Sequence, residues 1–309
     1  MKIYRSLEEI PFEKETCLTL GTFDGIHLGH QEIIRSLTRA VNGTGRSVLL
    51  TFSPHPQKIV GGDDKLCLLT TLEEKQHILK SLGIDALLIM SFNPRLASQP
   101  PRDFIMEIVR NVGVRCFFIG FNHAFGKDRT GDEKLLNQVG DQCGFKVAVI
   151  PPVLVHGETV SSTRIRRKLH QGLVQEAALM LGRPYCVEGK VVRGHGLGHR
   201  IGFPTANIRV SDRDKLIPGH GVYAVQVHYR RRSFSGMCYI GFRPTVNGHS
   251  KGIEVHVLGT VEDLYQQRLR VLFLNRIREE KKFESVDRLR EQINEDKLRV
   301  KQLLSSVNE

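Results

Sequence analysis

The sequence lacks a long hydrophobic run. No apolar stretch in its 309 residues approaches the ~20 residues that cross a bilayer as a helix. Residues 1–10 carry charges and have no signal-peptide core. We therefore expect a cytoplasmic protein without a membrane partner.

Cysteine is scarce, with six residues and no CxxC pair. Most lie in apolar runs such as "VRCFFIG", which is typical of buried thiols and argues against a disulfide framework or a zinc site. Internal repeats and low-complexity segments are also missing. What remains is a chain with 40% apolar residues, enough for packed cores, and its length predicts two domains of ordinary size.

The formal net charge is +12. Residues 1–183 have 23 basic and 19 acidic side chains, and residues 184–309 have 22 and 14. A basic balance predicts anionic partners. The basic clusters are short, Arg164–Lys168 and Arg230–Arg232, and there is neither a basic tail nor an RNP-like aromatic motif. We therefore expect small phosphorylated ligands and no nucleic-acid partner.

Residues 1–183 alternate between strand and helix patterns. Continuous apolar runs predict strands at 17–20, 47–52, 86–90, 114–120 and 146–150. Helical patterns occupy 30–40, 71–82, 101–111 and 133–142, and two short helices follow between Ser161 and Leu181. Five such βα units predict an α/β domain, a doubly wound, Rossmann-like parallel sheet with helices on both faces.

Residues 184–309 change to short alternating strands. The runs "CVEGKVV", "GVYAVQVHY", "SFSGMCYI", "GIEVHVLG" and "RLRVLFL" are separated by Gly and Pro turns and predict a small antiparallel barrel. Gly182 and Pro184 break helices, so we place the domain boundary at 183/184. A C-terminal helix is expected after the capping residue Ser285, and its apolar pattern slips at 294–296, which leaves room for a break there.

The stretch "LTLGTFDGIHLGHQEII" (18–34) places His27 and His30 three residues apart, after a strand and a glycine turn and at the start of a helix. Gly21 and Gly25 permit a tight turn with backbone close to a ligand. Ligands bind at the carboxyl edge of open α/β sheets, and the free N–H groups of a helix start bind phosphate. Histidine donates hydrogen bonds to phosphate oxygens, so the pair predicts a nucleotidyl-transfer site. The alternative is a turn with two ordinary histidines.

Three further segments offer polar side chains near the same sheet edge. "TFSPHP" (51–56) holds His55 in a loop fixed by two prolines. The second segment is "IGFNHAFGKDRTGD" (119–132), which supplies Asn122, Lys127 and Arg129. The third is "VSSTRIRRKL" (160–169), which supplies a capping Ser161 or Ser162 together with Arg164 and Arg166. The alternatives are plain loops and a capped amphipathic helix with a solvated basic face.

The stretch "GKVVRGHGLGHRIGFPTANI" (189–208) joins a glycine-rich loop to polar residues. The glycines predict amides that fold over phosphates, although barrel corners and hairpins also use glycine. Thr205 and Asn207 put a hydroxyl and an amide on one face of an extended segment, and both suit a Mg²⁺ held mainly by phosphates and water; a polar turn is the alternative. Glu254 lies opposite Ile253 and Val255, either as a solvent-facing carboxylate or as the base for an attacking hydroxyl.

The string "GTFDGIHLGHQ" resembles the HxGH signature of the nucleotidylyltransferase superfamily. With the three segments above, in this order, it resembles the N-terminal module of the bifunctional riboflavin kinase/FAD synthetase family. The resemblance implies an FMN adenylyltransferase in 1–183, with His27 and His30 as the catalytic pair. The implied ATP contacts are Gly21, Phe23, His27, His30, Ser162, Thr163, Arg164 and Arg166. The implied flavin contacts are Asp24, His55, Pro56, Asn122 and Arg129. His123 stands where many relatives have an aromatic residue.

The string "GFPTAN…GVYAV…YIGFRPTVNG…IEVH…EDLY…IREEKKF" resembles the riboflavin kinase domain over nearly all of 184–309. The resemblance implies a six-stranded Greek-key barrel with Glu254 as the base for the riboflavin 5′-hydroxyl. The implied ATP contacts are Gly194, Gly196, Gly198, Thr205 and Asn207. Thr205 and Asn207 are the implied Mg²⁺ ligands, and Arg278 is the implied flavin contact. His199 replaces a usual Arg, and Tyr265 lacks the glycine that commonly follows it.

Together these observations predict a bifunctional enzyme that phosphorylates riboflavin to FMN and then adenylylates FMN to FAD, with ATP as co-substrate and Mg²⁺ in each site. Positioning and charge stabilisation carry both steps. Two alternatives stay open. One is an adenylyltransferase for another phosphorylated small molecule with the barrel as substrate module. The other is a non-enzymatic regulator that responds to flavin or RNA, supported by the net charge and the "RIRRK" helix.

Overall fold

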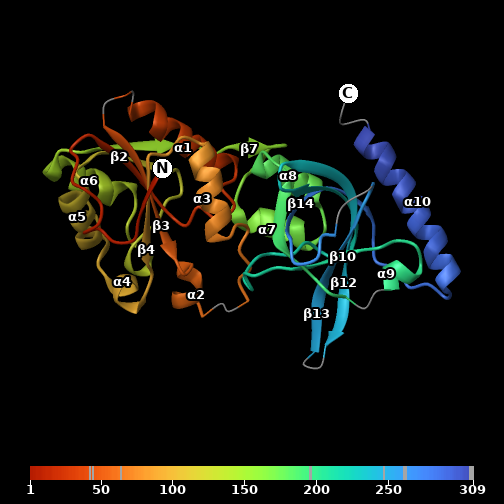
Figure 1. The fold of residues 1–309 in the computed structure, drawn as a ribbon. Helices are drawn as coiled ribbons and strands as arrows, with labels where there is room; N and C mark the ends of the chain where they lie inside the picture. The colour runs from red at the N-terminus through yellow and green to blue at the C-terminus, as the bar shows by residue number, and fades with distance from the viewer. Residues whose placement is uncertain are drawn as a thin grey trace. The chain divides into compact units, whose positions relative to one another are not determined.

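The computed structural model describes residues 1–41, 43, 45–62, 65–194, 197–245, 248–259 and 263–305. The chain forms two compact units, Met1–Ser162 and Thr163–Glu309 (Figure 1). The helices α7 (Ser162–His170) and α8 (Val174–Leu181) lie almost entirely in the second unit, where α8 packs on the barrel strand β14 (Arg268–Arg278). The division by contacts therefore precedes the predicted boundary at 183/184.

The first unit is built on a parallel sheet of six strands with the order β1-β4-β3-β2-β5-β6. The strands are β1 (Lys2–Tyr4), β2 (Thr16–Leu20), β3 (Arg46–Ser53), β4 (Ala86–Ser91), β5 (Val114–Gly120) and β6 (Lys146–Ile150). Every predicted strand is confirmed, and the structure adds the short edge strand β1. β2 is buried along its whole length, as expected for a strand covered on both faces.

Helices cover both faces of this sheet. Their bounds are α1 (Leu28–Val41), α2 (Pro56–Val60), α3 (Leu72–Ser81), α4 (Pro94–Ser98), α5 (Pro101–Val112) and α6 (Glu133–Cys143). α5 and α6 share one apolar core with the sheet, and α1 and α3 share the other (Figure 1). The predicted doubly wound α/β class is thus confirmed. A 3₁₀ turn (Lys127–Arg129) and a small hairpin of β7 (Leu154–Val155) and β8 (Glu158–Thr159) complete the unit.

The second unit is a closed antiparallel barrel with the strand order β10-β13-β12-β11-β14-β9. Besides β14, its strands are β9 (Tyr185–Val192), β10 (Ala206–Arg209), β11 (Gly221–Tyr229), β12 (Arg232–Thr245) and β13 (Gly248–Val257). A short helix α9 (Leu197–Arg200) precedes β10, and α10 (Val286–Ser305) lies along the outside. The predicted barrel is confirmed, with six strands as the resemblance implied.

The helix α10 is continuous from Val286 to Ser305, so the break considered at 294–296 is wrong. The apolar pattern slips there because Asp296 is buried, at 3% exposure, and binds Arg278 of β14. Val300 and Leu304 continue the apolar face against β11 and β12. Among the described residues, every helix is too short or too polar to traverse a lipid bilayer.

Candidate functional site

The chain reverses its direction of strand addition at β2. β3 and β4 lie on one side of β2, and β5 and β6 lie on the other. Such a switch point opens a crevice at the carboxyl ends of the two central strands, and this is where open α/β sheets bind ligands. The turn from Gly21 to His27 leaves β2 at that point and leads into α1.

This turn has a strained backbone. Phe23 and Ile26 have φ angles of 46° and 40°, in the left-handed region that a β-branched residue such as Ile rarely adopts. Side chains hold the strained residues in place, since Gln31 Nε2 donates to the Ile26 carbonyl at 2.9 Å. Strain of this kind costs on the order of 1–3 kcal/mol per residue and persists only where the surroundings determine it.

A neighbouring segment, Leu69 to Lys75, holds the turn from the side. The buried Asp24 carboxylate accepts the backbone N–H groups of Leu69 and Thr70 at 3.0–3.1 Å. The Gly25 N–H donates to Thr70 Oγ1 at 3.0 Å. The ammonium of Lys75 donates to the Thr22 carbonyl at 2.6 Å. This support was not predicted from the sequence. The structure gives Asp24, a predicted flavin contact, a bracing position beneath the turn.

The two histidines lie against each other at the start of α1. Their rings are stacked, with centroids 3.6 Å apart and planes 16° apart. The His30 backbone N–H approaches His27 Nδ1 at 3.4 Å, which leaves the His27 ring proton on Nε2. Gly29 provides the space for this arrangement, because a Cβ there would lie 3.3 Å from the His27 ring. A larger residue at position 29 would therefore have to displace the His27 ring by a few tenths of an ångström.

His30 is electrically neutral in this setting. Burial holds its pKa well below the usual value, and the nearby His27 and Lys75 lower it further. Its Nδ1 is buried without a hydrogen-bond partner, and the Phe23 ring lies 4.9 Å away between centroids. A neutral imidazole with an unused polar atom is ready to accept or donate a hydrogen bond to a ligand.

Other predicted residues of the first unit lie on loops at the carboxyl ends of the strands. Pro56 is the first residue of α2, and His55 caps this helix by accepting the Gln57 N–H at 3.3 Å. Asn122 and Arg129 are exposed on the loop between β5 and α6. Phe23 is buried, and Gly21 packs on its ring.

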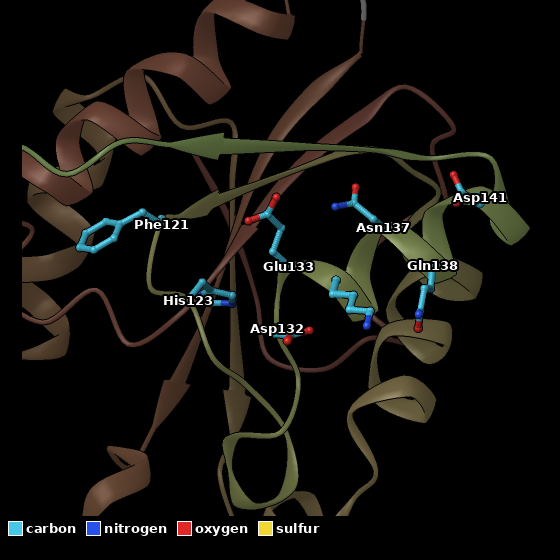
Figure 2. A pocket seen from close by; sticks show the side chains of 9 residues that line it. Phe121, His123, Asp132, Glu133, Asn137, Gln138 and Asp141 are labelled. Carbon is cyan, nitrogen blue, oxygen red and sulfur yellow. The ribbon is translucent and has the colours of Figure 1, made fainter.

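A hollow of about 640 Å³ opens beside this loop. It is lined by Gly120, Phe121, His123, Asp132, Glu133, Lys134, Asn137, Gln138 and Asp141. Figure 2 shows the loop side chains Phe121 and His123 across from those of α6. Burial lowers the pKa of His123 to about 4, so this ring is neutral, and it stacks on Phe125 with centroids 5.6 Å apart. Sequence reasoning missed the helix side of this hollow.

The predicted phosphate segment begins α7. The Ser162 hydroxyl donates to the Asp24 carbonyl at 2.9 Å, which places it directly under the histidine turn. Thr163, Arg164 and Arg166 follow in the first two turns of the same helix. Their backbone belongs to the second unit.

In the barrel, the predicted polar residues come together on the outer face. Thr205 Oγ1 donates to Glu254 Oε2 at 3.1 Å. Asn207 of β10 pairs directly with Glu254 of β13, so the two side chains point to the same face. Ile253 and Val255 point into the core, at 3% and 0% exposure, as predicted.

The glycine-rich loop lies on these polar residues. A Cβ on Gly194 would lie 2.1 Å from Asn207 Nδ2, so this glycine lets the loop approach the cluster. A Cβ on Gly198 would lie 2.4 Å from the backbone carbonyl oxygen of Phe203 and 3.2 Å from Thr205 Oγ1, so Gly198 is required mainly by the backbone beside it. Gly196, the third predicted glycine, lies outside the described residues.

Replacing Gly194 by alanine is expected to push the Asn207 amide out of place. Overpacking of this kind costs about 1–3 kcal/mol. If that cost falls on the loop that approaches ATP, the KM for ATP of riboflavin phosphorylation rises by about 5- to 150-fold. Steady-state kinetics at varied ATP test this. Conversion of added FMN to FAD by the same variant is the control, and an unchanged kinase KM would contradict the close contact.

Arg278 lies farther along the same row of paired strands. Its Nε donates to both Asp296 oxygens, at 3.0 and 2.9 Å. Burial raises the pKa of Asp296 and Arg278 opposes that rise. Tyr239, the partner of Glu254 on β12, donates its hydroxyl to Glu280. Sequence reasoning missed Tyr239 and Asp296, although both flank the predicted residues.

The donor set around Asn207 fits a hard cation. It consists of a hydroxyl, an amide and a carboxylate, which are oxygen ligands of the kind Mg²⁺ takes together with phosphate oxygens and water. Within the described ranges, no three His, Cys, Asp or Glu side chains form a metal cluster of their own. The residues therefore suit an ion that arrives with a nucleotide.

A switch-point histidine pair in one unit and a polar row under a glycine loop in the other define a two-domain enzyme that transfers phosphorus groups. Two family models match, FAD synthetase at residues 9–164 and riboflavin kinase at residues 181–304. The chain belongs to the bifunctional riboflavin kinase/FMN adenylyltransferase family. This confirms the predicted enzyme class, a transferase with both activities in one chain.

Known relatives agree along the full length. The bifunctional riboflavin kinase/FMN adenylyltransferase of Escherichia coli K12 is 35% identical and covers 96% of each chain. The Pseudomonas fluorescens relative of that name is 36% identical, again over 96% of each. A solved Streptococcus pneumoniae structure described as a macrolide-efflux protein has a TM-score of 0.89 at 30% identity, covering 97% of this chain and 98% of that chain.

Proposed function

We propose that this protein makes FMN from riboflavin on the barrel and FAD from FMN at the sheet edge, with ATP as the donor in both steps. The stacked histidine pair on a braced turn, at the switch point of the sheet, is the observation that carries the proposal. It places ring N–H donors beside a helix start, where the phosphates of a nucleotide bind. We also propose a cytoplasmic location, because both steps use ATP.

In adenylyl transfer, an oxygen of the FMN phosphate attacks the α-phosphorus of ATP. A new P–O bond forms, the bond to the β-phosphate oxygen breaks, and pyrophosphate leaves with the electron pair. Negative charge builds on the α-phosphate and on the leaving group. Two imidazole rings face this charge: His27 offers its Nε2–H, and His30 offers its ring nitrogen. The N–H groups at the start of α1 further stabilise the charge.

We propose that the residues predicted to contact ATP and flavin do so around the histidine pair. Gly21, Phe23 and Ser162 lie in or directly beneath the turn, and Thr163, Arg164 and Arg166 follow as donors to the phosphates. The proposed flavin contacts lie on the loops that follow β3 and β5, and they are His55, Pro56, Asn122 and Arg129. The neutral His123 and the exposed Phe121 give one side of the hollow of Figure 2 a surface for a planar ring of one substrate, opposite the charged and polar side chains of α6.

In riboflavin phosphorylation, the 5′-hydroxyl attacks the γ-phosphorus of ATP and ADP leaves. Glu254 accepts the hydroxyl proton, and the Thr205 hydroxyl orients its carboxylate. Thr205 and Asn207 would hold Mg²⁺, which neutralises phosphate charge when bound. Gly194 and Gly198 allow the loop amides to approach the phosphates. Arg278, fixed by Asp296, is the proposed flavin contact.

Incubating the protein with riboflavin, ATP and Mg²⁺ is expected to give FMN first and FAD later, with one pyrophosphate released per FAD. Chelation by EDTA is expected to stop both products. Chromatography of the flavins with a pyrophosphate assay measures this. FMN without FAD would leave only a kinase, and pyrophosphate release with a different phosphorylated acceptor would favour the other adenylyltransferase. Salt-dependent RNA binding without flavin turnover would favour the regulator.

A further inference from the structure

A buried lysine lies next to the histidine turn, and the proposed chemistry does not use it. Lys75 is in the first turn of α3, is 7% exposed, and lies at helical spacing between the apolar Leu72 and Leu79. Lysine is rarely buried unless its ammonium is paired or serves a function.

The ammonium of Lys75 contacts the turn directly, and it also contacts a strand residue that binds the same turn. Its Nζ donates to the Thr22 carbonyl at 2.6 Å and to Thr51 Oγ1 at 3.2 Å. Thr51, the buried residue near the end of β3, donates its own hydroxyl to the same Thr22 carbonyl at 3.1 Å. One carbonyl of the turn is therefore fixed by two donors from two different elements.

We propose that Lys75 is a positioning residue for adenylyl transfer, which fixes the turn that carries the histidine pair. The inference rests on the proposed function of the first unit. The geometry supports it, because Thr22 immediately precedes the strained Phe23. The positive charge of Lys75 has a second effect, which is on the ring of His30.

The groups that act on His30 are its neighbour His27 and Lys75, and both disfavour the imidazolium. Asp24 faces Lys75 and favours its charge, but burial prevails and lowers the pKa of Lys75 to about 8. At neutral pH the ammonium is therefore still mostly protonated. Removing its charge relieves one of the causes that depress the pKa of His30, so that pKa must rise. Burial, the larger cause, remains, and keeps it below the usual value.

A neutral His30 gives the phosphates a hydrogen-bonding ring with a constant charge across the physiological pH range. With Lys75 in place, the imidazolium of His30 forms only well below pH 6.5. Without it, the imidazolium forms at higher pH.

The test is an NMR titration of the His30 ring in the full-length, ligand-free protein, with the signal assigned through a His30→Asn variant. In Lys75→Met we expect the midpoint to rise, and kcat for FAD formation from FMN to fall because the turn is no longer fixed. Lys75→Arg keeps the charge and is expected to leave the midpoint in place. Lys80→Met, an exposed lysine on the same helix, is the matched control.

Equal midpoints in the wild type, Lys75→Met and Lys75→Arg would overturn the electrostatic role. A wild-type His30 that titrates near pH 6.5 would overturn it without any variant.

Thr51→Val, which removes a neutral partner of Lys75, tests the positioning role if Lys75→Met fails to fold. This variant is expected to lower kcat for FAD formation and to leave the His30 midpoint unchanged. An unchanged kcat would contradict that role. If the wild type makes no FAD, the proposed function fails, while the midpoints still decide the effect of Lys75.

Discussion

Replacing His30 by alanine is expected to stop FAD formation and to leave riboflavin phosphorylation intact. The imidazole is neutral, half-buried and stacked on His27, so it is already oriented before the substrates arrive. Loss of one preorganised donor at a developing oxyanion lowers kcat by about 10²–10³. Separate assays, FAD from added FMN and FMN from riboflavin, measure the two activities in the same preparation.

The control for this variant is His77→Ala. His77 is an exposed histidine on α3 whose Nδ1 lies 2.9 Å from the Glu73 carbonyl of its own helix. It is expected to keep both activities. Loss of both activities in a folded His30→Ala protein would contradict the assignment of the two reactions to separate sites, and full FAD formation would remove the histidine pair from the mechanism.

The substitution Glu254→Gln is expected to have the reciprocal effect. Glutamine keeps the shape of the side chain and can still accept the Thr205 hydroxyl hydrogen bond, but it does not take up the proton of the attacking hydroxyl. General-base catalysis contributes about 10²–10⁴ in rate, so riboflavin phosphorylation falls by that factor while added FMN is still converted to FAD. Single-turnover formation of FMN measures the chemical step.

A barrel carboxylate away from the cluster provides the comparison. Glu188 of β9 pairs with Arg268 and Arg270, and surface ion pairs of this type contribute little to stability. Glu188→Gln is expected to phosphorylate riboflavin at the normal rate. If Glu254→Gln does the same, the carboxylate only orients Thr205, and the reaction proceeds without a protein base.

Much of the fold could be predicted because the strands are chemically uniform. β2 to β5 have long, continuous apolar runs that have to be buried, and runs of this kind identify parallel strands. The missed strands β1, β7, β8 and β10 carry no such signal, and β7 and β8 have only two residues each. β1 has three residues at an exposed edge, and β10 is four residues next to a glycine-rich loop. Their pairing depends on neighbours that are distant in the sequence.

The histidine site could be predicted from spacing, but its support could not. Lys75 and Asp296 each lie on the apolar stripe of a helix, where a charged residue is out of pattern. In α10 that departure leaves room for a break in the predicted helix, and in α3 it leaves the predicted helix unchanged. In both helices the charged group is buried because it binds a partner far away in the sequence. Lys75 donates a hydrogen bond to the Thr22 carbonyl, and Asp296 forms an ion pair with Arg278. A charge on an apolar stripe is the signal that would have revealed both.

The ion pair between β14 and α10 has a consequence for the newly made protein. Arg278 leaves the ribosome 18 residues ahead of Asp296, so all six barrel strands are synthesised before the counter-ion of this guanidinium. The ion pair with Asp296 forms only when α10 packs on the barrel. Nascent chains halted before Asp296 would thus contain every strand of the barrel without the counter-ion of Arg278, and the proposed flavin contact would await the synthesis of α10.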